Sequence, residues 1–246
     1  MTTRTAFVTG SSQGIGAATA RTLAAQGWRV IVHYAGSRDK AEALVAELRA
    51  GRAEAELVGA DLSDPGAPKA LAEQVAALCP DGLQGLVLNA AVMPASDIAT
   101  CSEETFDRIV AVNLRAPFFL LQALSPVLAD GAGVVFVSSL TARRVTGGVA
   151  AYATMKGGTE TLVRRAAHEF GARGIRVNAV APGTTATGPI AAWAQTPAGF
   201  ETIVRDQALK RVARPDDIAG PIAFLLDDAA RWITGAVIPV DGGALL

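Results

Sequence analysis

The stretch TAFVTGSSQGIGAATARTLAAQG (residues 5–27) joins an apolar run, a glycine-rich turn and an alanine-rich segment. The run TAFVT (5–9) is typical of a buried strand, and GAATARTLAAQG (16–27) is typical of a helix. The glycines between them let the backbone turn tightly and approach a ligand without a Cβ in the way. A strand that enters a helix through such a turn predicts the opening unit of a doubly wound α/β sheet.

The rest of the chain repeats this alternation of apolar runs and helical segments. Near-continuous Val, Ile and Leu in the runs indicate strands buried on both faces, as in a parallel sheet that helices cover. We therefore predict one α/β domain over residues 1–246, with a mostly parallel sheet of about seven strands and helices on both faces. The expected strands are residues 5–9, 29–34, 55–60, 85–90, 133–139, 175–181 and 236–240.

The composition excludes several classes of protein. Half of the residues are apolar, 18% are charged and the net charge is −1, so neither nucleic acid nor a membrane surface is an expected partner. Cys79 and Cys101 have no metal-ligand spacing, and no metal site is predicted. Two weakly charged stretches, 116–142 and 177–200, contain Pro and Gly and are not expected to span a membrane. Because residues 2–4 lead directly into a strand-like run, we expect no signal peptide and a cytoplasmic location.

The glycine-rich turn is a candidate phosphate cradle. Its glycines have the spacing G-x-x-x-G-x-G, and a helix that begins near Gly14 points free N–H groups and its positive dipole end at an anion. A tight strand–helix connection is the plain alternative, but the position after the first strand favours a dinucleotide. The predicted cofactor-binding residues here are Gly10, Ser12, Gln13, Gly14, Ile15 and Gly16.

The segment YATMK (152–156) places a phenol and an ammonium on one face of an expected helix, because Tyr152 and Lys156 are four residues apart. The unperturbed pKa of a tyrosine is about 10. A cation beside the phenol would favour its ionised form and lower that pKa. Tyr152 is therefore either an ordinary amphipathic residue or a proton-transfer group.

An ordered set of motifs gives a more specific indication. The chain contains TGSSQGIG (9–16), NAA (89–91), VNL (112–114), SS (138–139), YATMK, PG (182–183) and WITGAVIPVDGG (232–243) in that order. With these motifs the chain resembles the short-chain dehydrogenase/reductase family over essentially its whole length, and it looks closest to the 3-oxoacyl-acyl-carrier-protein reductases. The resemblance implies a Rossmann-type fold and an oxidoreductase that acts on CH–OH and C=O groups.

The resemblance also implies four catalytic residues. Tyr152 would be the acid–base, and Lys156 would lower its pKa and bind the nicotinamide ribose. Ser139 would hold the substrate carbonyl, and Asn113 would hold a water that connects Lys156 to solvent. Each of these residues alone also has an ordinary structural explanation, but their joint spacing favours the catalytic interpretation.

Other positions match cofactor contacts of the family. The resemblance places Asp61 and Leu62 at the adenine and residues 89–91 at the adenine ribose. One departure is that Leu88 and Ala91 stand where the family usually has Asn and Gly, which puts the local turn and the approach of the ribose in question. The resemblance therefore adds to the expected cofactor contacts Asp61, Leu62, Asn89, Ala90, Ala91, Tyr152, Lys156, Pro182, Gly183, Thr185 and Thr187.

The end of the second expected strand favours NADP over NAD. An NAD-binding protein usually has an acidic residue there, whereas this chain has His33 and Tyr34. Ser37 and Arg38 follow, a hydroxyl and a guanidinium suited to a 2′-phosphate. NAD remains the alternative, because Gln13 stands where many NADP-using relatives have a basic residue.

The substrate is expected between residues 140–150 and 187–206, with a substrate loop at about 185–210. Trp193, Phe200 and their neighbours suggest an apolar lid. Arg143 and Arg144 are candidates for contact with an anionic group, with a solvated arginine pair as the plain alternative. We favour a free small ketone or secondary alcohol as substrate.

The first alternative is a carrier-bound 3-oxoacyl group. The carrier-protein reductases dock an acidic partner with basic residues, but the turn VLADGAGVV (127–135) has no cation, which leaves Arg173 as one candidate docking charge. A second alternative is a regulator that binds NADP without chemistry. The resemblance also implies a homo-oligomer, commonly a tetramer, with residues 116–124 and the closing GGALL (242–246) as candidate contacts.

Overall fold

Seven parallel strands form one sheet in the order β3-β2-β1-β4-β5-β6-β7 within the part of the chain that the structure describes. The computed structural model describes residues 3–145, 147–244 and 246. Thr146 of the expected substrate wall and Leu245 of the closing segment lie outside these residues. The strands are β1 (Thr5–Val8), β2 (Arg29–Tyr34), β3 (Ala55–Gly59), β4 (Leu83–Leu88), β5 (Leu128–Val137), β6 (Arg176–Pro182) and β7 (Val237–Val240).

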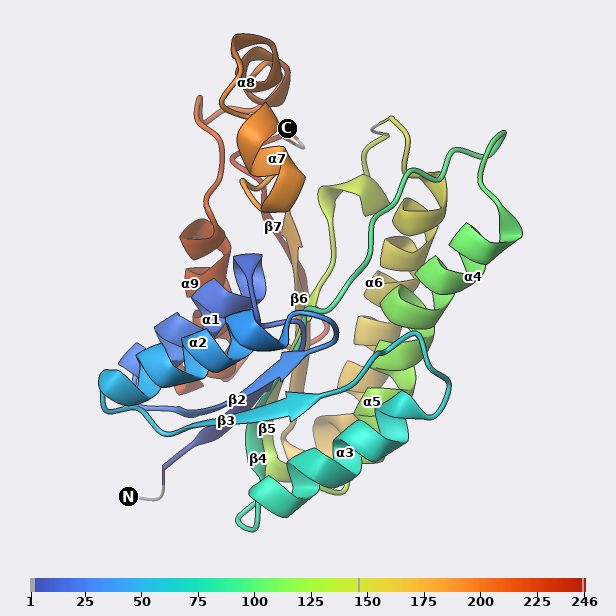
Figure 1. Ribbon diagram of the computed structural model, residues 1–246. Coiled ribbons are helices and arrows are strands. Elements are labelled where there is room, and N and C mark those ends of the chain that lie inside the picture. Colours follow the sequence, from blue (N-terminus) through green and yellow to red (C-terminus); the bar gives the residue numbers. More distant parts are fainter. Residues whose placement is uncertain (1–2, 146, 245) are drawn as a thin grey trace.

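Helices cover both faces of this sheet (Figure 1). One face carries α1 (Gly14–Ala25), α2 (Arg38–Ala50) and α9 (Pro215–Leu226). The other carries α3 (Ala67–Leu78), α5 (Ala116–Leu124) and α6 (Ala150–Phe170). A π-helical turn, Ala111–Arg115, joins α4 (Glu103–Val110) to α5, and α7 (Gly188–Trp193) and α8 (Pro197–Val204) stand above the carboxyl edge of the sheet. Short 3₁₀ turns occupy Leu140–Ala142, Gly171–Arg173 and Asp228–Ala230.

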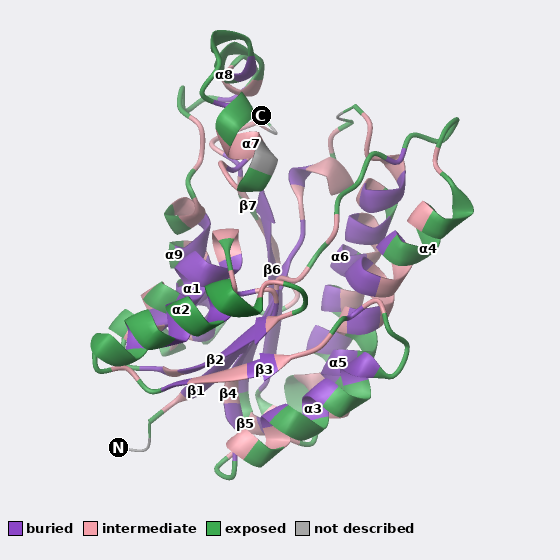
Figure 2. Cartoon of the chain, in the orientation of Figure 1, coloured by how far each residue is buried: buried purple, intermediate pink, exposed green. Residues whose placement is uncertain are grey.

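The strands are buried because helices pack on both of their faces. Figure 2 shows the central strands in the colour of buried residues and the outer faces of the helices as exposed. Phe7 and Ile31 belong to the core under α3, α5 and α6, whereas Val8 and Val30 belong to the core under α1, α2 and α9. This alternation confirms the predicted doubly wound fold.

The fifth strand begins earlier than the sequence predicts. The expected strand was 133–139, but β5 starts at Leu128 and contains most of the segment expected to be a turn. The pairing with β4 shifts from Leu83↔Leu128 to Gly85↔Gly133, and Gly131 between these pairs has a φ of +81°. The turn is therefore an irregular insertion within β5, which the periodicity of apolar residues does not report.

The sheet order reverses between β1 and β4, and this reversal locates the ligand-binding edge. In doubly wound sheets, ligands bind outside the carboxyl ends of the strands at such a point. The glycine-rich turn follows β1, Asn89 follows β4, Ser139 follows β5 and Gly183 follows β6. Among the residues that the structure describes, no helix combines the length and the apolar character needed to cross a bilayer.

Candidate active site

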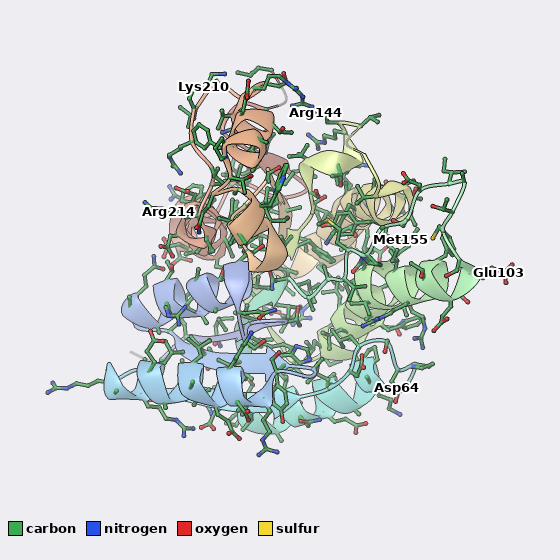
Figure 3. The ribbon with its side chains drawn as sticks, turned by 45° about the horizontal axis from the view of Figure 1, so that its top comes forward. Asp64, Glu103, Arg144, Met155, Lys210 and Arg214 are labelled. Carbon is green, nitrogen blue, oxygen red and sulfur yellow. The ribbon has the colours of Figure 1, made fainter. Side chains whose placement is uncertain are left out.

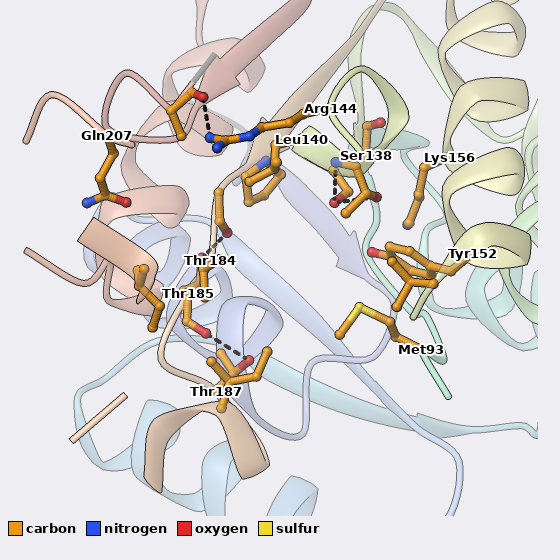
Figure 4. Close-up of a pocket in the computed structure, with 18 of the residues that line it drawn as sticks. Met93, Ser138, Leu140, Arg144, Tyr152, Lys156, Thr184, Thr185, Thr187 and Gln207 are labelled. Atoms are coloured by element: carbon orange, nitrogen blue, oxygen red, sulfur yellow. Dashed lines mark hydrogen bonds between the residues drawn. The ribbon is translucent and has the colours of Figure 1, made fainter. Parts of the chain in front are cut away.

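A cavity of about 730 Å³ lies at the carboxyl edge, between α6, the loop after β5 and the α7–α8 segment. Figure 4 shows Tyr152 and Lys156 on one side of this cavity and Thr184, Thr185 and Thr187 on the other. Expected site residues after β4, β5 and β6 and on α6 meet here with Ile15 of the glycine-rich turn, whereas the cavity is not lined by Ser37, Arg38, Asp61, Leu62 or Asn113. The predicted site residues that line the cavity are Ile15, Asn89, Ala91, Ser139, Tyr152, Lys156, Pro182, Gly183, Thr185 and Thr187.

The glycine-rich turn has the geometry of a phosphate cradle. Gly10 and Gly14 have φ values of +63° and +58°. A Cβ on Gly16 would lie 2.5 Å from the carbonyl oxygen of Gly10, so no side chain fits there. The side chain of Gln13 does not cap α1, which leaves the first amides of the helix available to an anion. This turn fits the pyrophosphate of a dinucleotide.

Asn89 holds this turn against the end of β4. Its Nδ2 donates hydrogen bonds to the carbonyl oxygens of Thr9 and Gly10, at 2.9 and 3.1 Å. The hydroxyl of Thr9 accepts from the amides of Asn89 and Ala90. A Cβ on Gly10 would lie 2.9 Å from Ala90 Cα, so the two turns pack closely even though Leu88 and Ala91 replace the usual residues.

His33 supports the glycine-rich turn from below and does not face a ribose. Its Nδ1 accepts from the Gly10 amide at 2.9 Å, and its Nε2 lies 3.1 Å from the carbonyl oxygen of Ala60. The ring is buried, and burial lowers its pKa to about 4, so the imidazole stays neutral. The sequence pattern singled out His33 but not its contact with the glycine-rich turn, because its partners Gly10 and Ala60 follow other strands.

Tyr152 and Lys156 lie one turn apart on α6, as predicted. The Lys156 Nζ donates to the carbonyl oxygen of Val137 at 2.7 Å and lies 5.4 Å from the centroid of the Tyr152 ring. Both side chains are buried, and one of the three ammonium protons is used, which leaves the others available to a ribose.

The pKa of Tyr152 departs from the sequence-based expectation. Lys156 was expected to lower it, but burial dominates and raises the pKa of Tyr152 to about 12, while the Ser139 hydroxyl acts in the opposite direction. Burial also lowers the pKa of Lys156 to about 8. Residue spacing reports the neighbouring cation but not the loss of water around the phenol, and this loss has the larger effect on the pKa of Tyr152.

Ser139 lies two residues after the end of β5, and its hydroxyl proton is available. Its Oγ accepts from the amide of Thr141 at 3.2 Å and from the Thr141 hydroxyl at 3.0 Å. Because both contacts with Thr141 use lone pairs of the Ser139 oxygen, the Ser139 O–H can donate to an oxygen in the cavity.

Asn113 lies in the π-helical turn and is buried. Its Oδ1 accepts from the Val92 amide at 2.9 Å, and its Nδ2 donates to the Val92 carbonyl oxygen at 2.7 Å. The Val92 backbone thus holds the side chain through one donor and one acceptor, and the main-chain carbonyl oxygen, 3.5 Å from the Thr159 hydroxyl, is a further acceptor for a water. The predicted relay can use that carbonyl without disturbing the contacts of the amide side chain.

The two expected adenine contacts behave differently. Asp61 is exposed, and its Oδ1 accepts from the amide and the hydroxyl of Ser63, which lowers the pKa of its carboxyl. Leu62 is buried in the core, so its side chain cannot contact an adenine. The backbone of Leu62 remains for that contact, because its side chain packs into the core from the turn that follows β3.

The loop after β6 closes the cavity opposite α6. Thr185 donates to the carbonyl oxygen of Gly183 at 3.0 Å, and a Cβ on Gly14 would lie 3.2 Å from the Thr187 Cγ2. Thr187 therefore contacts the glycine-rich turn across the cavity. Thr184 also lines the cavity and was missed, although it lies between two predicted residues.

The cations expected to bind a 2′-phosphate are arranged differently from the prediction. Arg38 donates to Glu42 at 2.7 Å across one turn of α2 and is exposed, while the Ser37 side chain does not cap that helix. Lys40, which sequence reasoning missed, donates to Gln13 Oε1 at 2.9 Å. The ammonium of Lys40 thus lies against the glycine-rich turn, at the place where a basic residue was missing from the sequence.

Neither arginine of the pair after β5 is free for an anionic ligand. Arg143 donates to Glu160 at 3.0 Å, and Arg144 donates to Asp206 at 2.6 Å and to the carbonyl oxygen of Ala244 at 2.7 Å. Figure 3 labels Arg144 between the α7–α8 segment and the loop before α6. Within residues 3–145, 147–244 and 246, no cluster of His, Cys, Asp and Glu side chains could hold a metal ion.

The comparisons with known proteins agree with this geometry. Residues 10–244 match the family model described as enoyl-(acyl carrier protein) reductase. The chain is 37% identical to a versicolorin reductase of Emericella nidulans, over 98% of this chain and 95% of that protein. It is 35% identical to the 3-oxoacyl-[acyl-carrier-protein] reductase of Staphylococcus aureus, over 98% of both chains.

Solved structures give the same result. The angucycline C-6 ketoreductase LanV with bound NADP superposes with a TM-score of 0.92 and 38% identity, over 98% of this chain and 95% of that one. Matches of this length and identity cover the glycine-rich turn, the expected catalytic segment and the lid together. The chain belongs to the short-chain dehydrogenase/reductase family.

Proposed function

We propose that the protein is an NADP(H)-dependent carbonyl reductase that transfers hydride between the nicotinamide and a small ketone or secondary alcohol, with Tyr152 as the acid–base. The observation that supports this most directly is that one cavity is lined by Tyr152, Lys156 and Ser139 together with Ile15 of the glycine-rich turn. By their names, the LanV protein is a ketoreductase and the Emericella nidulans protein is a reductase of versicolorin.

Each of these residues would have one role in the reaction. Bound NADPH would supply the hydride to the carbonyl carbon. Ser139 would donate a hydrogen bond to the carbonyl oxygen, where negative charge develops. Because the pKa of Tyr152 is raised to about 12, its phenol is protonated at neutral pH and can give its proton to that oxygen. Lys156 would stabilise the resulting phenolate, since an opposite charge nearby favours the ionised form.

The lining of the cavity supports a free and largely apolar substrate. Met93, Val145 and Trp193 line the cavity and are themselves exposed at its rim, and Leu140 and Ile190 extend the apolar wall. The guanidinium groups of Arg143 and Arg144 are paired with carboxylates. A neutral ketone needs no free cation here, whereas an anionic substrate would compete with Glu160 or Asp206.

The 3-oxoacyl-carrier-protein reductase remains the second candidate, because of the likeness to the Staphylococcus aureus enzyme. Arg173, its candidate docking charge, is used within the fold. It donates to Asp130 at 2.8 Å, to the carbonyl oxygen of Ser125 at 2.7 Å and to that of Leu128, and so ties the start of β5. These contacts favour a structural role for Arg173 over a docking role.

One assay separates the two candidates. We expect kcat/KM with NADPH to be at least about tenfold higher for a free ketone than for a 3-oxoacyl chain on a carrier protein, since one lost charge-assisted contact is worth about that factor. The measurement follows nicotinamide absorbance over a panel of ketones, a free 3-oxoacyl thioester and the same chain on the carrier. A carrier-bound substrate that outperforms the panel would reverse the order. Tight NADPH binding with no turnover on any substrate would favour the third alternative, a regulator that binds NADP without chemistry.

The choice of NADP rests on the LanV structure, which holds NADP, and on the cations at the glycine-rich turn. We expect Lys40→Ala to weaken NADPH binding about tenfold and NADH binding less than about twofold, because only NADPH has the 2′-phosphate that an ammonium would contact. Fluorescence titration with each nucleotide measures this, with exposed Lys69→Ala on α3 as the control. Equal weakening of both nucleotides would remove Lys40 from this role.

The oligomer proposed here is the homotetramer that the family resemblance implies. Phe106 on α4, Phe118 and Phe119 on α5, and Phe224 on α9 are all exposed in the single chain. Apolar side chains in these positions are consistent with surfaces that a second copy covers. The cytoplasmic location stays a prediction.

A further inference from the structure

Glu160 is a buried carboxylate that the proposed chemistry does not use. It lies on α6, four residues after Lys156 and eight after Tyr152, so the three side chains share one face of the helix. Its side chain is only 9% exposed. Since a buried charge is costly unless it is paired and hydrogen-bonded, the partners of Glu160 indicate what the residue is for.

Those partners lie on both sides of Ser139 in the sequence. Ser138, the first residue after β5, donates its hydroxyl to Glu160 Oε1 at 3.2 Å. Arg143, directly after the 3₁₀ turn Leu140–Ala142, donates its Nε to Glu160 Oε2 at 3.0 Å. One carboxylate therefore fixes the residue before Ser139 and the segment after it to the helix that carries Tyr152.

Lys156 makes the same kind of attachment one turn earlier. Its ammonium donates to the carbonyl oxygen of Val137, two residues before Ser139. The end of β5 is thus attached to α6 through Val137 and Ser138, and the following segment through Arg143. Ser139 itself accepts hydrogen bonds from Thr141 within its own turn. Its hydroxyl also faces the Tyr152 phenol and lowers the pKa of that phenol, so the placement of this turn against α6 decides how the two groups meet.

We propose that Glu160 is a positioning residue that sets the Ser139 hydroxyl against the Tyr152 phenol. The two reacting side chains come from different segments, the loop after β5 and α6, and must approach the same carbonyl oxygen. A displacement of about 1 Å in such an arrangement can cost about 10²-fold in rate. This inference rests on the proposed reductase function, which the Tyr152 variant tests separately.

The test compares Glu160→Ala with Glu160→Gln. We expect Glu160→Ala to lower kcat for ketone reduction about 10- to 100-fold and to change the NADPH dissociation constant less than about threefold, because the phosphate cradle and Lys156 are untouched. Glu160→Gln keeps an acceptor for Ser138 and should recover part of the lost kcat. If Glu160 only stabilised the fold, its replacement would weaken NADPH binding and lower kcat together.

Asp130→Asn is the matched control, because Asp130 pairs with Arg173 at the opposite end of β5 and lies away from the cavity. It should leave kcat unchanged. If Glu160→Ala does not fold, Ser138→Ala is the alternative test, because it removes the hydrogen bond from Ser138 to Glu160 and leaves the Arg143–Glu160 pair intact. A lower kcat with unchanged NADPH binding in Ser138→Ala supports the proposal. Wild-type kcat in a folded variant, or parallel losses of kcat and NADPH affinity, would overturn it.

Discussion

Replacement of Tyr152 by phenylalanine is expected to lower kcat for ketone reduction by about 10³-fold or more, which is within the range for removal of a positioned general acid. The phenol is the group that the cavity offers as a proton donor beside Ser139. Its pKa of about 12 keeps the phenol protonated at neutral pH. The substitution therefore removes a proton donor that is present in nearly every molecule. If hydride reaches the carbonyl carbon and no proton reaches the carbonyl oxygen, that oxygen becomes an alkoxide that nothing neutralises.

The phenylalanine variant should remain folded and bind NADPH. The ring of Tyr152 packs with Ile109, Ala151 and Met155, and phenylalanine preserves that packing. The hydroxyl is the only group lost. Steady-state kinetics at saturating NADPH, circular dichroism and a fluorescence titration of NADPH measure the three expectations. Tyr34→Phe, which changes the only other tyrosine, controls for loss of a phenol elsewhere and should keep kcat. A Tyr152→Phe variant with kcat within about tenfold of wild type would exclude Tyr152 as the acid.

The arrangement of the fold was largely predictable because it depends on local patterns. Runs of β-branched and aliphatic residues report strands that are buried on both faces, and all seven expected strands are present. The edge at which the site lies follows from the order of the strands, since parallel strands present their carboxyl ends together. The spacing of Tyr152 and Lys156 likewise predicted one face of one helix.

The roles that depend on partners from other elements were not predictable in this way. The ring of His33 binds the backbone of Gly10 and Ala60, and the Asn113 amide is occupied by Val92, neither of which local spacing reveals. Burial around Tyr152 is a property of the packed molecule, and it reversed the expected direction of the pKa shift. Glu160 was overlooked for the same reason, because its sequence neighbours do not show that a carboxylate at this position is buried.

Lys156→Met is expected to lower kcat for ketone reduction about 10²-fold and to remove a pH dependence near pH 8. Burial lowers the pKa of Lys156 from 10.5 to about 8. The ammonium that would stabilise the Tyr152 phenolate is therefore present below about pH 8 and lost above it. Reduction by the wild-type protein should fall as the pH rises through that value, and the variant should show no such fall.

The same substitution should leave stability nearly unchanged below pH 8. The folded pKa of Lys156 lies below its unfolded value, so the unfolded chain binds more protons between about pH 8 and 10.5, and the buried ammonium costs stability at lower pH. The shift from 10.5 to about 8 corresponds to about 3 kcal/mol, which Met would relieve. Against this gain, the Val137 carbonyl loses its partner, at a cost of about 1 to 3 kcal/mol.

Activity and stability therefore change in different ways, and this difference makes the variant a sharp test. The pH profile of kcat/KM, measured about two units either side of pH 8, reports the titration of Lys156, and thermal unfolding near neutral pH reports its burial. Lys69→Met, which removes an exposed lysine on α3, should reproduce the wild-type profile. If the fall in rate near pH 8 persists in Lys156→Met, another group titrates there, and the ammonium of Lys156 does not support the phenolate.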